Sequence, residues 1–301
     1  MKRKTHPDGR VEAEQEDNDG AGSDSAHSTK DSTQEPDDKL IKSVNALPTC
    51  QFRDRYIDPS ALNHTFTSVG IAQTATIDFK ASADLSKEEA TSCLSLIEST
   101  SRADYELSSF GWHPKRKRRE MLEPEMRYLL VRDPVTTEQT HADLKGAESV
   151  AGFLSFMMTY DSSPSVPVAY IYEIHLAESL RGTGLGRHLM EVVEGVAKRV
   201  GVEKVMLTCF LSNEKALGFY GRRGFKKDVC SPDDRQTRRK VVKVDYVIMS
   251  KDVEGEKKGE GEVVSPAKGN GLVATVRDWT SRLAGKQLRD GQEVAQMRGW
   301  V

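Results

Sequence analysis

Residues 181–186, Arg-Gly-Thr-Gly-Leu-Gly, have the composition of an anion-binding turn. They lie between an apolar run, residues 168–176, and a stretch with helical apolar spacing. Gly182, Gly184 and Gly186 permit positive φ and let a ligand approach the backbone closely. The first N–H groups of a following helix carry partial positive charge toward that ligand. The sequence therefore predicts a site for a pyrophosphate or another anion at a strand-to-helix turn.

Two well-known phosphate loops do not fit these residues. A P-loop requires Lys followed by Ser or Thr after its second glycine, where this chain has Arg187 and His188. A dinucleotide-binding fingerprint that starts at Gly182 would place its last glycine at Arg187. The pattern that remains is Arg-x-x-Gly-x-Gly. Taken alone, it is compatible with a structural turn as well as with a cofactor site, so the neighbouring residues must decide.

A carboxylate, Glu173, lies near the end of the strand expected before this loop. Such a group can act as a general base toward an amine, directly or through water. The alternative is a strand charge that pairs with a neighbouring lysine or arginine. Strand alternation sends Tyr172 and Glu173 to opposite faces, so both can face one cleft only if the strand is bulged nearby. We therefore predict a bulge in this strand.

The elements that would position these residues follow from the spacing of apolar side chains. Residues 184–200 have the spacing of an amphipathic helix, and Ser86 with Glu89 forms a capping box that opens another helix. Strands are expected at 74–79, 127–132, 150–159, 166–176, 204–210, near Phe225 and at 241–249, and further helices at 40–47, from Ser86 to about Ser101, at 114–122 and at 213–221. This order predicts an α/β (α+β) fold with a mixed central sheet and helices on both faces.

The predicted helix at 114–122 carries five consecutive basic residues, 115–119, Lys-Arg-Lys-Arg-Arg. Three interpretations stay open for this run. It is a nuclear-import signal, a phosphate contact or a solvated helix face.

Composition divides the 301-residue chain into three parts. Residues 1–39 are predicted to be a disordered acidic tail, because residues 1–40 contain 11 acidic and 6 basic residues and no aromatic one. Residues 40–250 are expected to form the folded domain, and residues 251–301 a low-complexity or weakly helical extension, with weak helices at 273–283 and 293–297. The whole chain has a formal charge of −2, so without the tail the rest carries about +3, too little to imply direct nucleic-acid binding.

The remaining bulk features exclude several protein classes. Four scattered cysteines, without a Cys-x-x-Cys pair, favour a reduced compartment and buried thiols over a disulfide framework or a metal site. No secretory signal is present, and no run of about 18 apolar residues exists to cross a bilayer. We expect a soluble, intracellular monomer with no membrane partner and no metal.

These motifs together resemble the GNAT superfamily of N-acetyltransferases. Residues 181–186 resemble its acetyl-CoA loop, which lies at a helix N-terminus of the GNAT fold. Further details resemble one branch, N-alpha-acetyltransferase D, which modifies histone amino termini. These details are Gly111-Trp112 before the basic helix, Glu120-Met121, Tyr170-Ile-Tyr-Glu173, and residues 204–208 with Asn213 after them. The resemblance covers residues 40–249.

The resemblance implies a role for each matching residue. Glu173 falls on the catalytic glutamate, and Tyr220 on a tyrosine that protonates the leaving thiolate in part of the superfamily. Acetyl-CoA contacts fall on Ile174, His175, Leu176, Arg181, Gly182, Thr183, Gly184, Leu185, Gly186 and Asn213. Contacts to the acceptor peptide fall on Tyr105, Trp112, Asp161, Tyr170, Tyr172, Thr208 and Tyr246.

The activity implied in this way is direct acetyl transfer, in a ternary complex, to the α-amino group of histone tails that begin Ser-Gly-Arg-Gly, of the H-four and H-two-A classes. Histone tails would be the partners, and nucleus and cytoplasm the location. Two alternatives stay open. One is the same fold acting on lysine side chains or small amines, and the other is a non-catalytic CoA-binding chromatin protein.

Overall fold

The computed structural model describes residues 36–253, apart from 69, 134, 137–148, 162–165, 237 and 239–240. The predicted tail up to residue 35 and the predicted extension from residue 254, with its two weak helices, lie outside the described residues. The first helix, α1 (Pro36–Asn45), begins four residues before the expected start of the folded domain.

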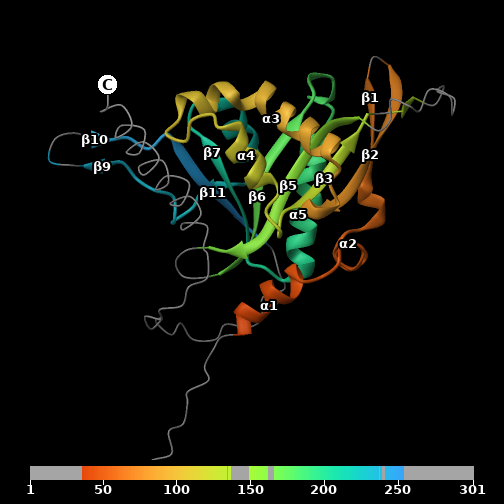
Figure 1. Ribbon diagram of the computed structural model, residues 1–301, viewed down its shortest axis with the longest axis horizontal. Helices are drawn as coiled ribbons and strands as arrows, with labels where there is room; N and C mark the ends of the chain where they lie inside the picture. The colour runs from red at the N-terminus through yellow and green to blue at the C-terminus, as the bar shows by residue number, and fades with distance from the viewer. Residues whose placement is uncertain are drawn as a thin grey trace, which may run out of the picture. The chain divides into compact units, whose positions relative to one another are not determined.

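A mixed sheet forms the centre of the described part (Figure 1), as the sequence predicts. Its strand order is β1-β2-β3-β5-β6-β7-β11-β8, with β4 paired to β2. Only the β6–β7 pair is parallel among these described strands. The strands are β1 (Asn63–Ser68), β2 (Ile71–Ala81), β3 (Arg127–Arg132), β4 (Val135–Thr136), β5 (Val150–Tyr160), β6 (Pro167–Leu176), β7 (Lys204–Phe210), β8 (Lys226–Lys227) and β11 (Tyr246–Asp252), and a separate pair is formed by β9 (Arg235–Gln236) and β10 (Val241–Val242).

Helices cover both faces of this sheet, which confirms the predicted architecture. The helices after α1 are α2 (Thr49–Tyr56), α3 (Lys87–Leu107), α4 (Pro114–Met121), α5 (Leu185–Val200) and α6 (Glu214–Arg222), with short 3-10 turns η1 (Pro59–Leu62), η2 (Ser82–Asp84) and η4 (Glu178–Leu180). One hydrophobic cluster joins α1, α2, α5 and α6 to the sheet, and a second joins α3 and α4 to it. The residues of β6 divide between the two sides, so this strand is buried on both faces.

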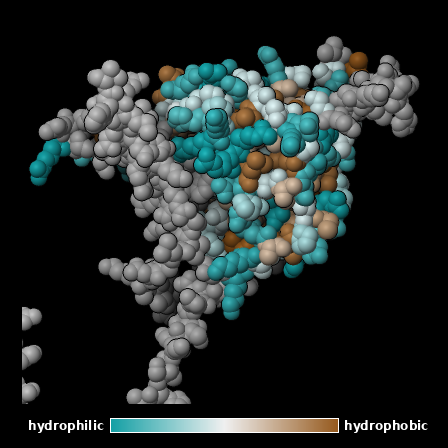
Figure 2. Space-filling view, in the orientation of Figure 1, coloured by the Kyte–Doolittle hydropathy of each residue, from teal (hydrophilic) through white to brown (hydrophobic). Residues whose placement is uncertain are grey.

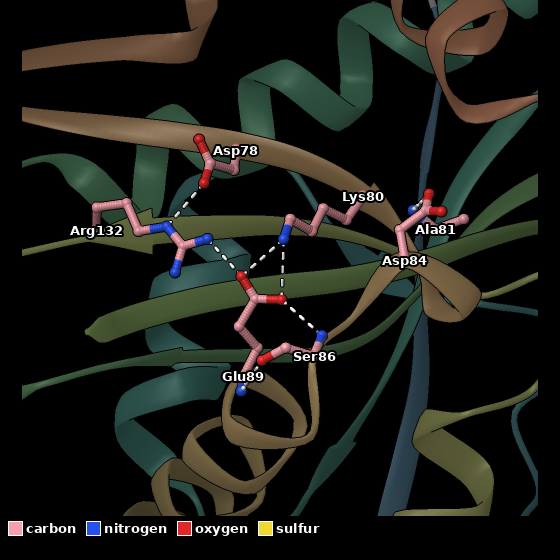
Figure 3. A network of polar contacts seen from close by, with 7 residues as sticks. All are labelled: Asp78, Lys80, Ala81, Asp84, Ser86, Glu89 and Arg132. Atoms are coloured by element: carbon pink, nitrogen blue, oxygen red, sulfur yellow. Dashed lines mark hydrogen bonds and ion pairs between the residues drawn. The ribbon is translucent and has the colours of Figure 1, made fainter. Parts of the chain in front are cut away.

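The N-terminus of α3 is fixed to the sheet by Glu89 (Figure 3). Ser86 and Glu89 form the predicted capping box, in which each side chain accepts a hydrogen bond from the other residue's backbone N–H. Glu89 also accepts hydrogen bonds from Lys80 on β2 and Arg132 on β3. Burial opposes ionisation of Glu89, but these donors lower its pKa to about 2. The helix that supplies part of the candidate site is therefore held at its start by charge pairing.

The structure differs from the sequence-based expectation in several elements. The expected strand at 241–249 is wrong, because the chain forms two short segments there, β10 and β11. Helix α3 continues six residues beyond Ser101, where Arg102 bridges Glu98 and Glu106 one turn to either side. Helix α2 and strand β1 were not predicted. Strand β1 has one buried side chain, Phe66, and so lacks a strong alternating pattern.

The cysteines and the surface add two further findings. Cys93 and Cys209 are buried as expected, whereas Cys50 is exposed and Cys230 is half-buried. On the face seen in Figure 2 the described residues are mainly hydrophilic, and apolar residues form separate areas. In the part of the chain that the structure describes, no helix is long and apolar enough to cross a bilayer.

Candidate active site

The parallel strands β6 and β7 stop pairing partway along their length, in the middle of the sheet. Their pairing runs from Val168↔Lys204 to Ile171↔Leu207 and then stops, although β6 continues to Leu176 and β7 to Phe210. A pocket of about 180 Å³ lies at this divergence and reaches helices α3, α4 and α6. It is lined by Ser101, Tyr105, Phe110, Gly111, Trp112, His113, Arg116, Lys117, Glu120, Tyr170, Ile171, Tyr172, Glu173, Ile174, His175, Leu207, Thr208, Cys209, Phe210, Asn213, Ala216 and Tyr220.

The predicted bulge is present in β6. In the pairing of β5 with β6, Ser155 lies opposite Glu173 and Phe156 opposite Ile171, so Tyr172 is the extra residue of β6 in this register. The extra residue changes which side chains share a face. Tyr172 packs with the cluster of α3 and α4, and the next residue, Glu173, contacts the same two helices. Both side chains therefore line one pocket, as the sequence analysis required.

Glu173 is buried and both of its carboxylate oxygens are occupied. Oε1 accepts hydrogen bonds from the hydroxyl of Tyr105 (2.8 Å) and from Nζ of Lys117 (2.7 Å), and Oε2 lies 2.6 Å from Nε2 of His175. Burial opposes ionisation, but Lys117 and His175 hold the pKa of Glu173 well below its usual range. The carboxylate is therefore an acceptor only, which makes Nε2 of His175 the donor.

Lys117 connects Glu173 to a second buried carboxylate, Glu120. Its Nζ donates to Oε1 of Glu120 and Oε1 of Glu173, each at 2.7 Å, and lies 4.8 Å from the ring centre of Tyr105. Burial would lower the pKa of Lys117, but the two carboxylates raise it well above its usual value. By contrast, burial raises the pKa of Glu120, and the neighbouring Glu173 charge adds to this shift while Lys117 opposes it. The pKa values of the two carboxylates are thus shifted in opposite directions.

Aromatic side chains form much of the remaining wall. Tyr105 packs on Trp112 with ring centres 5.6 Å apart, and the hydroxyls of Tyr170 and Thr208 are hydrogen-bonded to each other. Tyr172 donates to Sδ of Met157 at 3.3 Å. All of these residues except Met157 are predicted to contact an acceptor peptide, and they line the pocket.

Two of the predicted acceptor-binding residues do not line the pocket. Asp161 is 1% exposed and pairs with Nζ of Lys204 at 2.7 Å, and the same ammonium lies 3.1 Å from Asp228. Asp161, Asp228 and Cys230 have potential metal-ligand atoms within 4.8 Å of one another, but Lys204 already supplies the positive charge between the carboxylates. Tyr246 packs on Phe110, which lines the pocket in its place.

The glycine-rich loop has the geometry that an anion site requires. Gly182 and Gly184 have φ of +77° and +85°, and Gly184 is the N-cap residue of α5. The side chain of Leu185 is fully buried, so only its backbone is available to a ligand. The hydroxyl of Thr183 bonds to the carbonyl of Leu180, and Arg181 Nε to that of Leu176. The loop thus presents the first N–H groups of α5, and Gly186, one residue inside that helix, has no side chain to cover them.

The other predicted donor-site residues line the pocket, apart from Leu176 at the end of β6. Ile174, His175 and Leu176 belong to the part of β6 that no longer pairs with β7, which leaves a strand edge beside which an extended ligand can lie. Asn213 caps α6 by accepting from the N–H of Ala216 at 3.1 Å. Tyr220 lines the pocket, and burial raises the pKa of its phenol, so at neutral pH it can donate a proton or a hydrogen bond.

The sequence analysis missed Lys117 and Glu120 as site residues. In the basic run, Lys115 and Arg119 are exposed, whereas Lys117 is 7% exposed and Arg116 lines the pocket. A solvated helix face therefore describes only part of the run. The available signal was the spacing of three residues between Lys117 and Glu120, which places an ion pair on one helix face.

Comparison with known proteins agrees with this geometry. Residues 98–225 match the profile of the acetyltransferase (GNAT) family. The chain has the GNAT fold. The matched stretch includes α3 from Glu98 on, the residues that line the pocket and the glycine-rich loop.

Individual relatives differ in how much they cover. N-alpha-acetyltransferase 40 of Saccharomyces cerevisiae is 35% identical over 99 residues, which are 28% of this chain and 35% of that protein. The chain thus spans about a third of the length of this curated relative. Among solved structures, NAA60 of Arabidopsis thaliana in complex with a bisubstrate analogue is 15% identical, covers 60% of this chain and all of its own, and has a TM-score of 0.41. The NatC complex bound to Gag peptide and CoA is 17% identical, with 59% of this chain and 99% of its own covered and a TM-score of 0.40.

Proposed function

We propose that this protein transfers the acetyl group of acetyl-CoA to the α-amino group of a protein terminus, in a ternary complex. The observation that carries the proposal is the pocket at the β6–β7 divergence, where two carboxylates and seven aromatic side chains lie at the end of the exposed edge of β6. The relative named as an N-alpha-acetyltransferase supports the same acceptor class.

The acceptor class agrees with the acidity of the competing amines. An α-amino group has a pKa of about 8, against about 10.4 for lysine, so a terminal amine loses its proton more readily near neutral pH.

We further propose histone tails that begin Ser-Gly-Arg-Gly as the acceptor. This finer assignment rests on Trp112, Glu120-Met121 and Tyr170-Ile-Tyr-Glu173, which resemble the histone amino-terminal branch of the family. A nuclear and cytoplasmic location belongs to this proposal.

The test uses two synthetic peptides that start Ser-Gly-Arg-Gly and contain internal lysines, one with a free terminus and one with a blocked terminus. After incubation with acetyl-CoA, mass spectrometry should find one acetyl group on the terminal serine of the free peptide and none on the blocked peptide. Acetylation of lysines alone would overturn the proposal in favour of a lysine acetyltransferase. Turnover of small amines without peptide turnover would overturn it in favour of a metabolite enzyme.

A further inference from the structure

Glu120 differs from Glu173 in the contacts of its second carboxylate oxygen. Glu120 lies in the last turn of α4, lines the pocket and has a side chain that is 10% exposed. Its Oε1 accepts from Lys117, and in the described part of the chain no group bonds to Oε2. This oxygen is not among the buried polar atoms that lack a partner, so it is open to the pocket.

Both oxygens of Glu173, by contrast, are already bonded to protein groups. Three donors hold them, from Tyr105, Lys117 and His175. His175 is itself held in place by the hydroxyl of Thr100, 2.6 Å from its Nδ1. Protonation of Glu173 would remove the negative charge that these three donors share, and Lys117 would lose one of its two buried carboxylate partners.

We propose that Glu120 is the catalytic residue that accepts the proton of the acceptor amine, and that Glu173 is a positioning residue. Glu173 would hold Lys117, and through it Oε1 of Glu120, so that Oε2 faces the incoming amine. The inference rests on the proposed acetyl transfer to an amine.

The reaction step balances with Glu120 in this role. The acceptor enters as an ammonium and gives one proton to Oε2 of Glu120, directly or through one water. The lone pair thus freed forms a bond to the thioester carbonyl carbon, and the C–S bond breaks with its electron pair on sulfur. The nitrogen then loses a second proton. One of the two protons released neutralises the thiolate of CoA, and the other passes to solvent, which regenerates the Glu120 carboxylate.

The surroundings of Glu120 suit a proton acceptor better than those of Glu173. A general base is most effective when its pKa lies near the operating pH. Burial moves the pKa of Glu120 upward and the donors move that of Glu173 downward. The titratable and charged groups that face Glu120 are Arg116 and Lys117 on α4, Tyr105 on α3, Tyr128 on β3, and Tyr170, Tyr172 and Glu173 on β6.

The test compares kcat and KM over a pH series for the wild type, Glu120→Gln and Glu120→Asp. Glu125→Gln is the matched control, because Glu125 is an exposed acid five residues away that does not line the pocket. Glu120→Gln should lower kcat about 10²- to 10⁴-fold, the usual effect of losing a general base. In the wild type, protonation of Glu120 should make kcat fall at acidic pH, and we call this fall the acid limb. Glu120→Gln should lack it, so its remaining activity should rise with pH only as the acceptor amine deprotonates. Glu120→Asp should keep that limb at a lower kcat.

A structural role alone would give a different result. If Glu120 only pairs with Lys117, Glu120→Gln lowers thermal stability but keeps kcat within threefold of the wild type and keeps the pH profile, and the inference is overturned. Acetyl-CoA binding, measured by calorimetry, checks that each variant is folded. Should Glu120→Gln not fold, Glu120→Asp decides, because unchanged kcat at all pH values overturns the inference.

The same assay separates this inference from the proposed function. If the wild type acetylates the peptide terminus and Glu120→Gln does so equally well, only the role of Glu120 is wrong. If the wild type acetylates no peptide terminus, the proposed function is wrong and the role of Glu120 in that reaction is overturned with it.

Discussion

Two buried carboxylates in the pocket share one ammonium, yet their surroundings shift their pKa values in opposite directions. Glu173 accepts hydrogen bonds from three protein donors, and Glu120 from a single one. Pairs of titratable groups that differ in this way are typical of sites that move protons. The position of Glu173 could be predicted from the sequence, because its strand and the loop after it have local patterns. Lys117 could not, because its burial depends on a partner 56 residues away.

At the residue scale, Glu173→Gln should show which of the two carboxylates is the base. Removing the Glu173 charge removes a like-charge neighbour that raises the pKa of Glu120, so the acid limb of kcat/KM should move to lower pH. The measurement is the pH dependence of kcat/KM with the free-terminus peptide, and Glu125→Gln again serves as control. Complete loss of the acid limb in Glu173→Gln would instead make Glu173 the base.

At the scale of elements, the N-terminal ends of two helices, α3 and α5, position parts of the candidate site. Helix α5 starts at a left-handed glycine, and α3 starts at a capping box that is joined to two strands. The sequence predicted both starts correctly because each depends on residues that are close together in the chain. The end of α3 and the division of the region 241–252 were not predictable in this way, since long-range packing and pairing decide them.

Gly184→Ala should weaken donor binding. A side chain at φ +85° costs roughly 1–2 kcal/mol, and relaxing that strain would turn the N–H groups of α5 away from the anion. We expect the Kd for acetyl-CoA, measured by calorimetry, to rise about tenfold. Gly221→Ala is the control, because Gly221 lies inside α6 with open space around it and alanine favours a helix. Equal affinities in the two variants would show that the loop does not hold the donor.

Glu89→Gln should destabilise the fold in a pH-dependent manner. The pKa of Glu89 falls from its ordinary value of 4.5 to about 2 on folding. Its contribution is therefore complete above pH 4.5 and is lost as the pH falls toward 2. At pH 7 the free energy of unfolding should drop by about 3 kcal/mol, the usual cost of breaking a buried ion pair. Urea denaturation should show the difference from wild type shrinking in acid, whereas Glu88→Gln, at an exposed neighbour, should show little change at either pH.

At the scale of the molecule, the stretch that matches the family profile is smaller than the structure that buries its core. Residues 98–225 lack α1, α2, β1, β2 and β11. Without them the edges of β3 and β7 lose their partners, and the apolar face of α5 loses its contact with Phe52 and Tyr56. The mixed sheet itself was predictable from the order of its elements. The contribution of α2 and β1 was not, because their buried apolar residues are few and widely spaced.

We therefore predict that residues 98–225 alone do not fold, whereas residues 36–253 do. Thermal melts followed by circular dichroism should show a cooperative transition for the longer fragment only. Binding of acetyl-CoA to the longer fragment should raise its Tm, because a ligand at a hundred times its Kd adds about 2.7 kcal/mol to the folded state. A cooperative melt of the shorter fragment would contradict this prediction.

The extra residue in β6 changes which face of the sheet the side chains after it are on. Before Tyr172, even-numbered residues such as Val168 and Tyr170 share a face, and after it the odd-numbered Glu173 and His175 lie on the side of α3 and α4. If the same residues followed the regular alternation of a strand, without the bulge, Glu173 and His175 would face the apolar side that Ile174 and Leu176 now occupy. The chemistry of the pocket therefore depends on one added position in the strand as much as on the identity of the residues that follow it.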